Sequence, residues 1–174
     1  MPDNSGSSTT IQPLSADSFA ELLQFERENR AYFAEWIADR GDDYFTDFAR
    51  RNQALLEEQA TGDSYFFLIR DAENRLVGRV NLVDVADHSA TLGYRVAQAA
   101  AGLGHAGRAV SLACGFARDR GLHTITAMTS ANNHGSRKVL ERARFARVDL
   151  GPSTMLHNGS ELELVHYSLA LPSS

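Results

Sequence analysis

The sequence predicts a single domain of mixed α/β class, and two observations support this prediction. The chain has 174 residues, of which 43% are hydrophobic and 22% charged, as is usual for one globular domain with a sizeable core. Helical spacing dominates the first third of the chain, and three strands, a helix, a strand, a helix and two final strands follow it. This order lacks the strict strand–helix alternation of a doubly wound sheet.

Hydrophobic periodicity and turn residues place the individual elements. In order, we expect a strand at 11–14, helical segments at 15–37 and 45–60, a hairpin at 65–85, a strand at 88–96, a helix at 103–120, a strand at 123–129, a helix at 133–143, and strands at 145–150 and 161–169. Ser15 is suited to N-cap the first helix, and Gly121 to follow the long one. Gly78 interrupts an alternating strand and predicts a bulge.

The first ten residues differ in composition from the rest. They read MPDNSGSSTT, and they lack both the basic and the apolar segment of a signal peptide. We therefore expect residues 1–10 to be a disordered leader and residues 11–174 to form the domain. No apolar run approaches the roughly 20 residues that span a bilayer, so we expect no membrane partner.

Charge and cysteine content exclude several function classes. Seventeen Lys and Arg against 22 Asp and Glu give a net charge of -5, whereas a nucleic-acid module needs an excess of basic residues. Cys114 is the only cysteine, which predicts a reducing cytoplasmic location and a packing role for this side chain. The six His residues show no metal-ligand spacing such as H-E-x-x-H, so we expect no metal.

A glycine-rich segment from Gly93 to Val110, GYRVAQAAAGLGHAGRAV, is the most informative feature. A strand enters a glycine loop that opens a helix, and such a loop presents N–H groups and a positive helix end to phosphate. Gly102, Gly104 and Gly107 fit the dinucleotide pattern G-x-G-x-x-G, but no acidic residue stands about 20 residues further on. The segment therefore predicts a phosphate-binding loop of another kind.

Four motifs in order connect this loop to a known family. They are Asn29-Arg30 with Trp36, Gly93-Tyr94 with Ala101–Ala106, Ser130–Phe145, and Asn158-Gly159 through Glu163 to Tyr167. Through them the chain resembles the GCN5-related N-acetyltransferases, and among these the RimJ/RimL type that acetylates ribosomal-protein N-termini, over roughly 14–169. The resemblance implies a mostly antiparallel sheet with helices on both faces. It also implies acetyl transfer from acetyl-CoA to a primary amine, by direct attack in a ternary complex.

The resemblance implies a set of acetyl-CoA contacts, with backbone N–H groups of the fourth strand stabilising the oxyanion and the glycine loop holding the pyrophosphate. These residues are Tyr94, Arg95, Val96, Ala101, Gly102, Leu103, Gly104, His105, Ala106, Gly107, Arg108 and Asn133. Asn133 is also suited to N-cap a helix. Ala101 replaces the family's Gln or Arg, so we expect weaker CoA binding, by about 1.5 to 3 kcal/mol for one lost charged hydrogen bond. Arg144 stands where the family has a glycine.

The catalytic residues follow from the same resemblance. Ser136 matches the residue that protonates the departing thiolate, although a Ser in a first helical turn also satisfies backbone donors. Glu163 is our candidate for the general base, with His88 and His134 as alternatives. Thr91 stands where many relatives carry a glutamate.

The absence of that glutamate bears on the acceptor. An α-amine with a pKa near 8 is about a tenth neutral at pH 7, whereas a Lys near 10.4 is far less so. We therefore expect a protein N-terminal α-amine, with a polyamine, an aminoglycoside or a non-catalytic acyl-CoA-binding module as alternatives, in a monomer or homodimer. An acidic cluster either attracts a basic peptide or polyamine or is a solvated face; it consists of Asp39, Asp42, Asp43 and Asp47.

Overall fold

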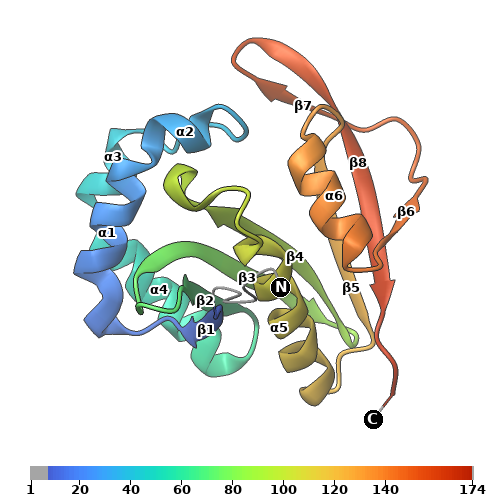
Figure 1. Ribbon diagram of the computed structural model, residues 1–174, viewed down its shortest axis with the longest axis horizontal. Coiled ribbons are helices and arrows are strands. Elements are labelled where there is room, and N and C mark those ends of the chain that lie inside the picture. The colour runs from blue at the N-terminus through green and yellow to red at the C-terminus, as the bar shows by residue number, and fades with distance from the viewer. Residues whose placement is uncertain (1–7, 174) are drawn as a thin grey trace, which may run out of the picture.

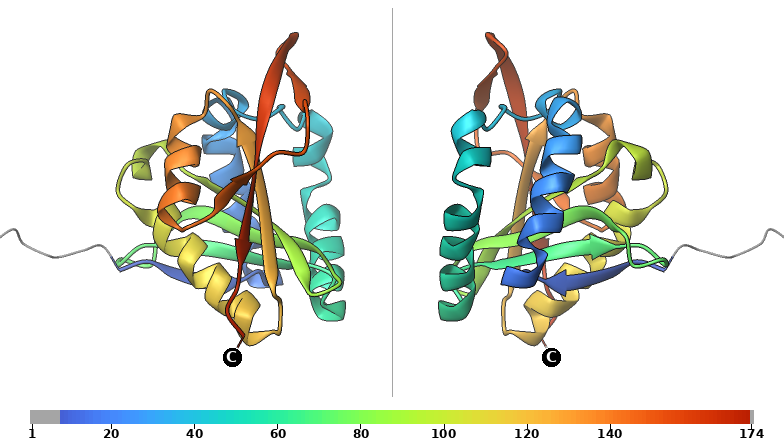
Figure 2. Two further views of the ribbon diagram at one scale, coloured as in Figure 1. Left: turned by 90° about the vertical axis from the view of Figure 1, so that its right-hand side faces the viewer. Right: turned by 90° about the vertical axis from the view of Figure 1, so that its left-hand side faces the viewer.

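A twisted sheet of eight strands separates two helical layers in this computed structural model, which describes residues 8–173 (Figures 1 and 2). The strands are β1 (Thr10–Pro13), β2 (Tyr65–Arg70), β3 (Leu76–Ala86), β4 (Ser89–Val96), β5 (Thr124–Ser130), β6 (Ala146–Val148), β7 (Thr154–His157) and β8 (Ser160–Ala170). Their order is β1-β2-β3-β4-β5-β8-β6, and β7 pairs with β8. Every pair is antiparallel except β4 with β5.

Helices cover both faces of the sheet (Figure 2). They are α1 (Phe19–Glu28), α2 (Arg30–Ala34), α3 (Asp42–Thr46), α4 (Phe48–Thr61), α5 (His105–Asp119) and α6 (His134–Arg142), with 3-10 turns at Ala16–Ser18 and Gln98–Ala100. The first four lie on one face, and α5 and α6 lie on the other. Among the described helices, none is long and apolar enough to cross a bilayer.

The alternation of side chains along β2, β3 and β4 divides the core into two clusters. Val80 and Leu82 of β3 belong to the cluster that α5 and α6 cover. Leu68 of β2, which pairs with Arg79, belongs to the cluster under α1 to α4. Because neighbouring residues of a strand point to opposite faces, Arg79 and its β4 partner Arg95 face α1 to α4, whereas Tyr94 faces α5 and α6.

The fold class and the layer arrangement predicted from the sequence are confirmed. The bulge predicted from Gly78 is also present, because the register between β2 and β3 shifts where Gly78 pairs with Ile69. A Cβ at Gly78 would lie 2.5 Å from the backbone oxygen of Arg95, so only glycine fits between β3 and β4 at this point.

The predicted helical boundaries in the first third were partly wrong. The segment expected as one helix over 45–60 is two helices, because the chain leaves helical geometry at Asp47 with φ -103° and ψ 21°. Helical spacing predicted a helix as far as residue 37, yet α2 ends at Ala34. The carbonyl oxygen of Ala34 contacts the side chain of His157 instead of continuing the helix. Tertiary contacts overrode the local pattern here.

Strand β7 was not predicted from periodicity. It has four residues, two of them exposed, and its only described pairing is with β8 through the turn at Asn158 and Gly159, which have φ values of 48° and 78°. Two positive φ angles in a two-residue turn are typical of a tight hairpin. The final strand is longer than expected as a result, and it starts at Ser160.

The N-terminal boundary lies close to the expected one. Residues 1–7 of the expected leader lie outside the described residues. Thr10 begins β1, and the hydroxyl of Thr9 lies 2.9 Å from Nδ1 of His105 on α5. Residues 9 and 10 therefore take part in the fold.

Candidate active site

A wedge opens in the centre of the sheet, between its two parallel strands (Figure 1). β4 and β5 pair only from Ser89–Thr91 to Thr124–Thr126 and then separate. β5 continues alongside β8 as far as Ser130, whereas the rest of β4 keeps β3 as its neighbour. The edge of β4 beyond Thr91 is therefore open toward the wedge.

Backbone N–H groups point into this wedge. The N–H of Ala97, the residue that follows β4, donates to the carbonyl oxygen of Val77 at 2.8 Å and so faces β3. Since N–H groups of a strand alternate in direction, those of Tyr94 and Val96 face the opposite edge, toward β5. These are two of the residues expected to donate to an oxyanion.

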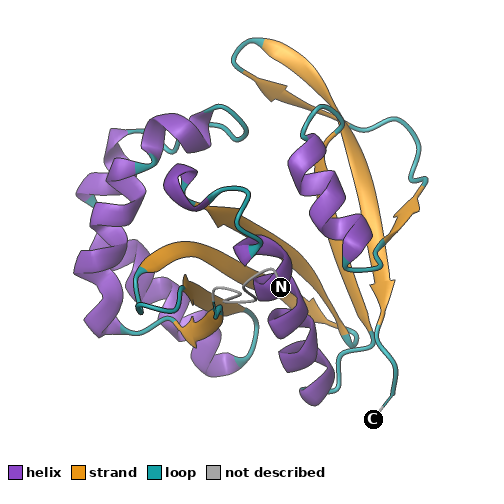
Figure 3. Cartoon of the chain, in the orientation of Figure 1, coloured by secondary structure: helices purple, strands orange, loops and turns teal. Residues whose placement is uncertain are grey.

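The glycine loop joins β4 to the first turn of α5 (Figure 3). Gly102 and Gly104 have φ values of 76° and 84°, a conformation that favours glycine. The N–H groups of His105, Ala106 and Gly107 belong to the first turn and have no carbonyl partner within the helix. A Cβ at Gly102 or Gly107 would meet no atom within 4 Å, so the loop leaves room for an anion at the positive end of α5.

The side chain of Arg108 lies beside the glycine loop, whereas that of His105 is buried. Arg108 folds back over Gly104, and its Nη1 donates to the carbonyl oxygen of Leu103 at 3.1 Å, so a positive charge stays beside the cradle. His105 is only 3% exposed and its ring is held by Thr9, so only its backbone is available to a ligand. Ala101 is exposed and contributes no polar side chain.

Ser136 and Tyr94 meet across the wedge. The hydroxyl oxygens of the two residues lie 2.9 Å apart, and Tyr94 Oη also donates to the backbone oxygen of Ser136 at 3.1 Å. Asn133 Oδ1 accepts from the N–H of Ser136 at 3.1 Å, which confirms the N-cap predicted for α6. The side chain of Ser136 is thus directed to Tyr94.

Burial of the Tyr94 phenol raises its pKa to about 12, while its hydrogen bond with Ser136 lowers it. The phenol therefore keeps its proton at neutral pH and acts as a donor. Sequence reasoning placed Tyr94 in the site through its backbone only. The Tyr94 hydroxyl is an additional functional group of the site. Its partner Ser136 is 42 residues further along the chain.

The base candidates are spread over different parts of the molecule. Glu163 is exposed on β8 in register with Thr154, and its charge contributes, after Tyr167 and Glu141, to the raised pKa of Arg137. By strand alternation its side chain lies on the face of Tyr167, toward α6. His134 is exposed at the start of α6.

His88 lies at the paired end of β4 and β5, before the strands separate. It stacks on His123 at 4.7 Å, and its neighbour Ser89 begins the paired part of β4. Thr91, at the position where the resemblance implied a glutamate, lies where the strands separate, and its hydroxyl is 3.2 Å from that of Thr126. The structure thus groups Ser136, Asn133 and Tyr94, and does not bring His88 to them.

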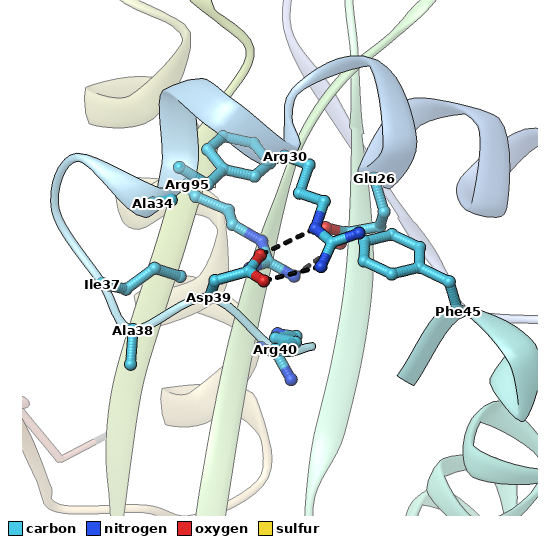
Figure 4. A pocket seen from close by; sticks show the side chains of 10 residues that line it. Glu26, Arg30, Ala34, Ile37, Ala38, Asp39, Arg40, Phe45 and Arg95 are labelled. Atoms are coloured by element: carbon cyan, nitrogen blue, oxygen red, sulfur yellow. Dashed lines mark hydrogen bonds and ion pairs between the residues drawn. The ribbon is translucent and has the colours of Figure 1, made fainter. Parts of the chain in front are cut away.

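Arg95 belongs to a buried ionic group on the opposite face. Glu26 of α1 is 3% exposed, and its Oε1 lies 3.1 Å from Arg79 Nη1 and 2.5 Å from Arg95 Nη2. Figure 4 shows Glu26 and Arg95. The guanidinium of Arg95 also stacks over the ring of Phe33, 4.9 Å from its centroid. The side chain of Arg95, expected to contact CoA, is therefore directed away from the glycine loop.

The surroundings of Arg95 act on its pKa in opposite directions. Burial lowers the pKa of Arg95, the nearby charges of Arg79 and Arg40 lower it further, and Glu26 opposes both. Glu26 is therefore the group that makes this arrangement stable.

The end of β7 connects to α2 above the wedge (Figure 1). His157 is 7% exposed, and its Nε2 lies 2.9 Å from the carbonyl oxygen of Ala34 and 3.2 Å from that of Ile37. Both partners are acceptors, so Nε2 carries the proton and donates to the end of α2. This contact was not predicted, because only the Asn158-Gly159 turn beside it was visible in the sequence.

The acidic cluster is largely neutralised within the chain. Arg30 binds Asp39 at 2.7 Å and Asp42 at 2.8 Å, and Asp47 pairs with Arg50 and Arg51 (Figure 4 shows the first pair). The hydrogen bond that Arg30 donates to Asp39 holds the pKa of that carboxyl below its usual value. The cluster therefore resembles a salt-bridged surface more than a free anionic patch.

Two remaining predictions concern Cys114 and metals. Cys114 packs against the core cluster of α5, and burial raises the pKa of its thiol to about 11, which suits a packing role. Within residues 8–173, His, Cys, Asp and Glu side chains form no group of three or more placed to hold a metal ion.

The split parallel pair, its backbone donors and the loop at the start of α5 together form the candidate active site. Residues 9–146 match the model of the acetyltransferase (GNAT) domain, and the chain belongs to this family. The probable N-acetyltransferase YjcK of Bacillus subtilis is 30% identical over 161 residues, covering 88% of this chain and 89% of that protein. The predicted family is confirmed, and the chain is an acetyltransferase of the GNAT type.

Solved structures share the fold. The ribosomal-protein-S5-alanine acetyltransferase from Vibrio fischeri has a TM-score of 0.86 at 21% identity, over 94% of this chain and 96% of that one. The spermidine N-acetyltransferase from Vibrio cholerae, in complex with CoA and spermine, has a TM-score of 0.79 at 17% identity, over 96% of both chains. Rim-type ribosomal-protein acetyltransferases are thus among the structural neighbours, and the acceptor classes of these neighbours differ.

Proposed function

We propose that the protein transfers the acetyl group of acetyl-CoA to the N-terminal α-amine of a protein or peptide. The observation that supports this best is the wedge, where the N–H groups of Tyr94 and Val96 and the hydroxyl of Ser136 converge beside the glycine loop. In this proposal the CoA pyrophosphate binds the loop at Gly102–Gly107, and the pantetheine arm follows the open edge of β4. CoA in the spermidine acetyltransferase neighbour supports this choice of co-substrate.

The chemistry requires no covalent acyl-enzyme. The neutral amine attacks the thioester carbon and forms the C–N bond, and the N–H groups of Tyr94 and Val96 stabilise the resulting oxyanion. The C–S bond then breaks, and the Ser136 hydroxyl gives its proton to the departing thiolate, while Tyr94 positions that hydroxyl. Ser136 then regains a proton from water. The proton of the attacking amine leaves to water, or to Glu163 as the carboxylate candidate.

The proposed class of acceptor amine is supported by the residues at the point where β4 and β5 separate. Thr91 and Thr126 place hydroxyls, not a carboxylate, where the two strands part. An α-amine near pKa 8 is already about a tenth neutral at pH 7 and needs only a weak base, whereas a lysine does not reach this fraction.

Calorimetry with acetyl-CoA, followed by a thiol-release assay over peptide and small amines, tests the proposal. We expect acetyl-CoA binding and faster turnover of a peptide α-amine than of a lysine side chain at pH 7. Equal turnover of the two amines would contradict the acceptor class. Binding without release on a broad panel would instead indicate a non-catalytic acyl-CoA-binding module.

Arg108 is expected to contribute to CoA affinity. Its guanidinium lies beside Gly104, where it can replace the charge that is absent at Ala101. Arg108→Gln should raise the dissociation constant of acetyl-CoA about tenfold, as expected for one charge-assisted hydrogen bond. Acetyl-pantetheine, which lacks the pyrophosphate, should be turned over at an unchanged rate.

Arg118→Gln, at the other end of α5, serves as the matched control. A loss of acetyl-pantetheine turnover equal to the loss with acetyl-CoA would assign Arg108 a structural role instead.

His157 is expected to affect the acceptor and not the co-substrate. His157→Ala removes the donor to Ala34 and Ile37 and frees the β7–β8 hairpin from the end of α2. The acceptor KM should rise several-fold, because ordering the hairpin then becomes part of the cost of binding. The dissociation constant of CoA should stay the same in this variant. The control His123→Ala should change neither quantity. An unchanged acceptor KM in His157→Ala would contradict this role.

A further inference from the structure

A cavity lies on the face of the sheet that α1 to α4 cover. It is open to solvent and has a volume of about 770 Å³ between α4 and strands β2 and β3. Arginines dominate its charged wall, and Glu57 is the single carboxylate among its lining residues; the arginines are Arg40, Arg50, Arg51 and Arg79. This is unusual in a chain with a net charge of -5.

The floor of the cavity is the strand next to β4. Arg79 and Asn81 of β3 line it, and they pair with Arg95 and Gly93 of β4. Paired residues of antiparallel strands have Cα atoms about 5 Å apart. A Cβ at Gly93 would meet no atom within 4 Å. The face of β4 that lies beside the cavity is therefore open at Gly93.

Three polar side chains of the lining have unused hydrogen-bonding groups. Within the described chain, Arg79 Nε, Asn52 Oδ1 and Asn81 Oδ1 are buried and have no partner. Arg79 is 4% and Asn52 1% exposed. Buried polar groups are normally satisfied, so these positions indicate a ligand. One donor and two acceptors match the carbonyl and N–H groups of a peptide.

The charge of the wall selects among ligands. Asp47 pairs with Arg50 and Arg51, and Glu26 pairs with Arg79. Arg40 stacks on Tyr44, 4.8 Å from the ring centroid, and no ion pair joins it to a carboxylate in the described chain. The cavity therefore keeps an excess of positive charge, which attracts anions and repels polycations.

We infer that this cavity binds a carboxylate on one of the first residues of the acceptor, so that the acceptor is an acidic peptide N-terminus. The inference rests on the proposed function, and it assigns a substrate class to the same site. An extended chain advances about 3.3 to 3.6 Å per residue, so the second or third residue of a peptide whose α-amine is in the wedge reaches β3. A polyamine does not fit this wall.

Binding of acetylated products tests the inference without turnover. Calorimetry in the presence of CoA compares the acetylated tripeptide amide Ser-Glu-Glu with its neutral counterpart Ser-Gln-Gln, and spermidine is a third probe. We expect the acidic peptide to bind about tenfold more tightly than the neutral one, with a difference that shrinks as salt is added. Equal affinities, or tighter binding of spermidine, would overturn the inference.

Variants of the wall provide the second part of the test. Arg40→Gln combined with Arg51→Gln should reduce the preference to about twofold, whereas Arg147→Gln, on the distant β6, should leave it at about tenfold. A preference that survives the double variant would place the carboxylate elsewhere. The free-amine peptides in the thiol-release assay separate the two proposals. Acid-selective binding without turnover contradicts the proposed function alone, and turnover without acid preference contradicts this inference alone.

Discussion

Ser136→Ala should lower kcat about 100-fold with acetyl-CoA and leave the dissociation constant of CoA unchanged. Removal of a general acid typically costs a factor of 10² to 10⁴, roughly, because the thiolate must then leave unprotonated. The hydroxyl that the variant lacks lies 2.9 Å from Tyr94 Oη, inside the wedge. Steady-state and single-turnover thiol release measure the effect, and calorimetry measures CoA binding.

The fold of this variant should be preserved. Tyr94 still donates to the backbone oxygen of residue 136, at 3.1 Å in the structure, and Asn133 still caps α6 through a backbone N–H. Ser111→Ala, an exposed serine of α5, is the matched control and should behave like the unaltered protein. An unchanged kcat would remove Ser136 from the mechanism, and a loss confined to the acetyl-CoA KM would leave it a binding role only.

Tyr94→Phe separates the two hydroxyls of the pair. The ring and its packing remain, while Ser136 loses its partner across the wedge. If Tyr94 positions the serine, kcat should fall less than in Ser136→Ala, and the double variant should be no slower than Ser136→Ala alone.

Features encoded by neighbouring residues were predictable from the sequence. The glycine loop and the Asn133 cap depend on backbone geometry over a few positions, and the structure has both. The pairs of Asp47 with Arg50 and Arg51 have helical spacing of three and four residues, so the neutralisation of this aspartate was also visible in principle.

Contacts between distant parts of the chain could not be predicted in the same way. Tyr94 and Ser136 are 42 residues apart, Glu26 and Arg95 are 69 apart, and His157 and Ile37 are 120 apart. No periodicity links such positions, because they meet only through the order of strands in the sheet. The direction of Arg95 shows the consequence: its place in a motif suggested a CoA contact, and the pleat of β4 turns its side chain to Glu26.

Glu26→Gln should produce the largest loss of stability. Glu26 is 3% exposed, and the side chains of Arg79 and Arg95 are 5% and 15% exposed, so the variant leaves two buried guanidinium groups without a counter-charge. Breaking a buried ion pair by removing one partner costs about 3 to 5 kcal/mol. For a chain of 174 residues, each kcal/mol lowers Tm by roughly 2 to 4 °C. Thermal and urea unfolding should therefore show a fall of Tm of about 10 °C.

Glu73→Gln is the matched control, because Glu73 is 66% exposed and pairs with the exposed Arg75. An exposed pair of this kind is worth less than about 1 kcal/mol. Adding Arg95→Met to Glu26→Gln should restore part of the stability, since one of the two uncompensated charges is then gone. If Glu26→Gln unfolds within about 1 kcal/mol of the unaltered protein, the arginines have found other partners or water. Because Arg95 stands between Tyr94 and Val96, a rise in the acetyl-CoA KM should accompany the loss of stability and be reduced in the double variant.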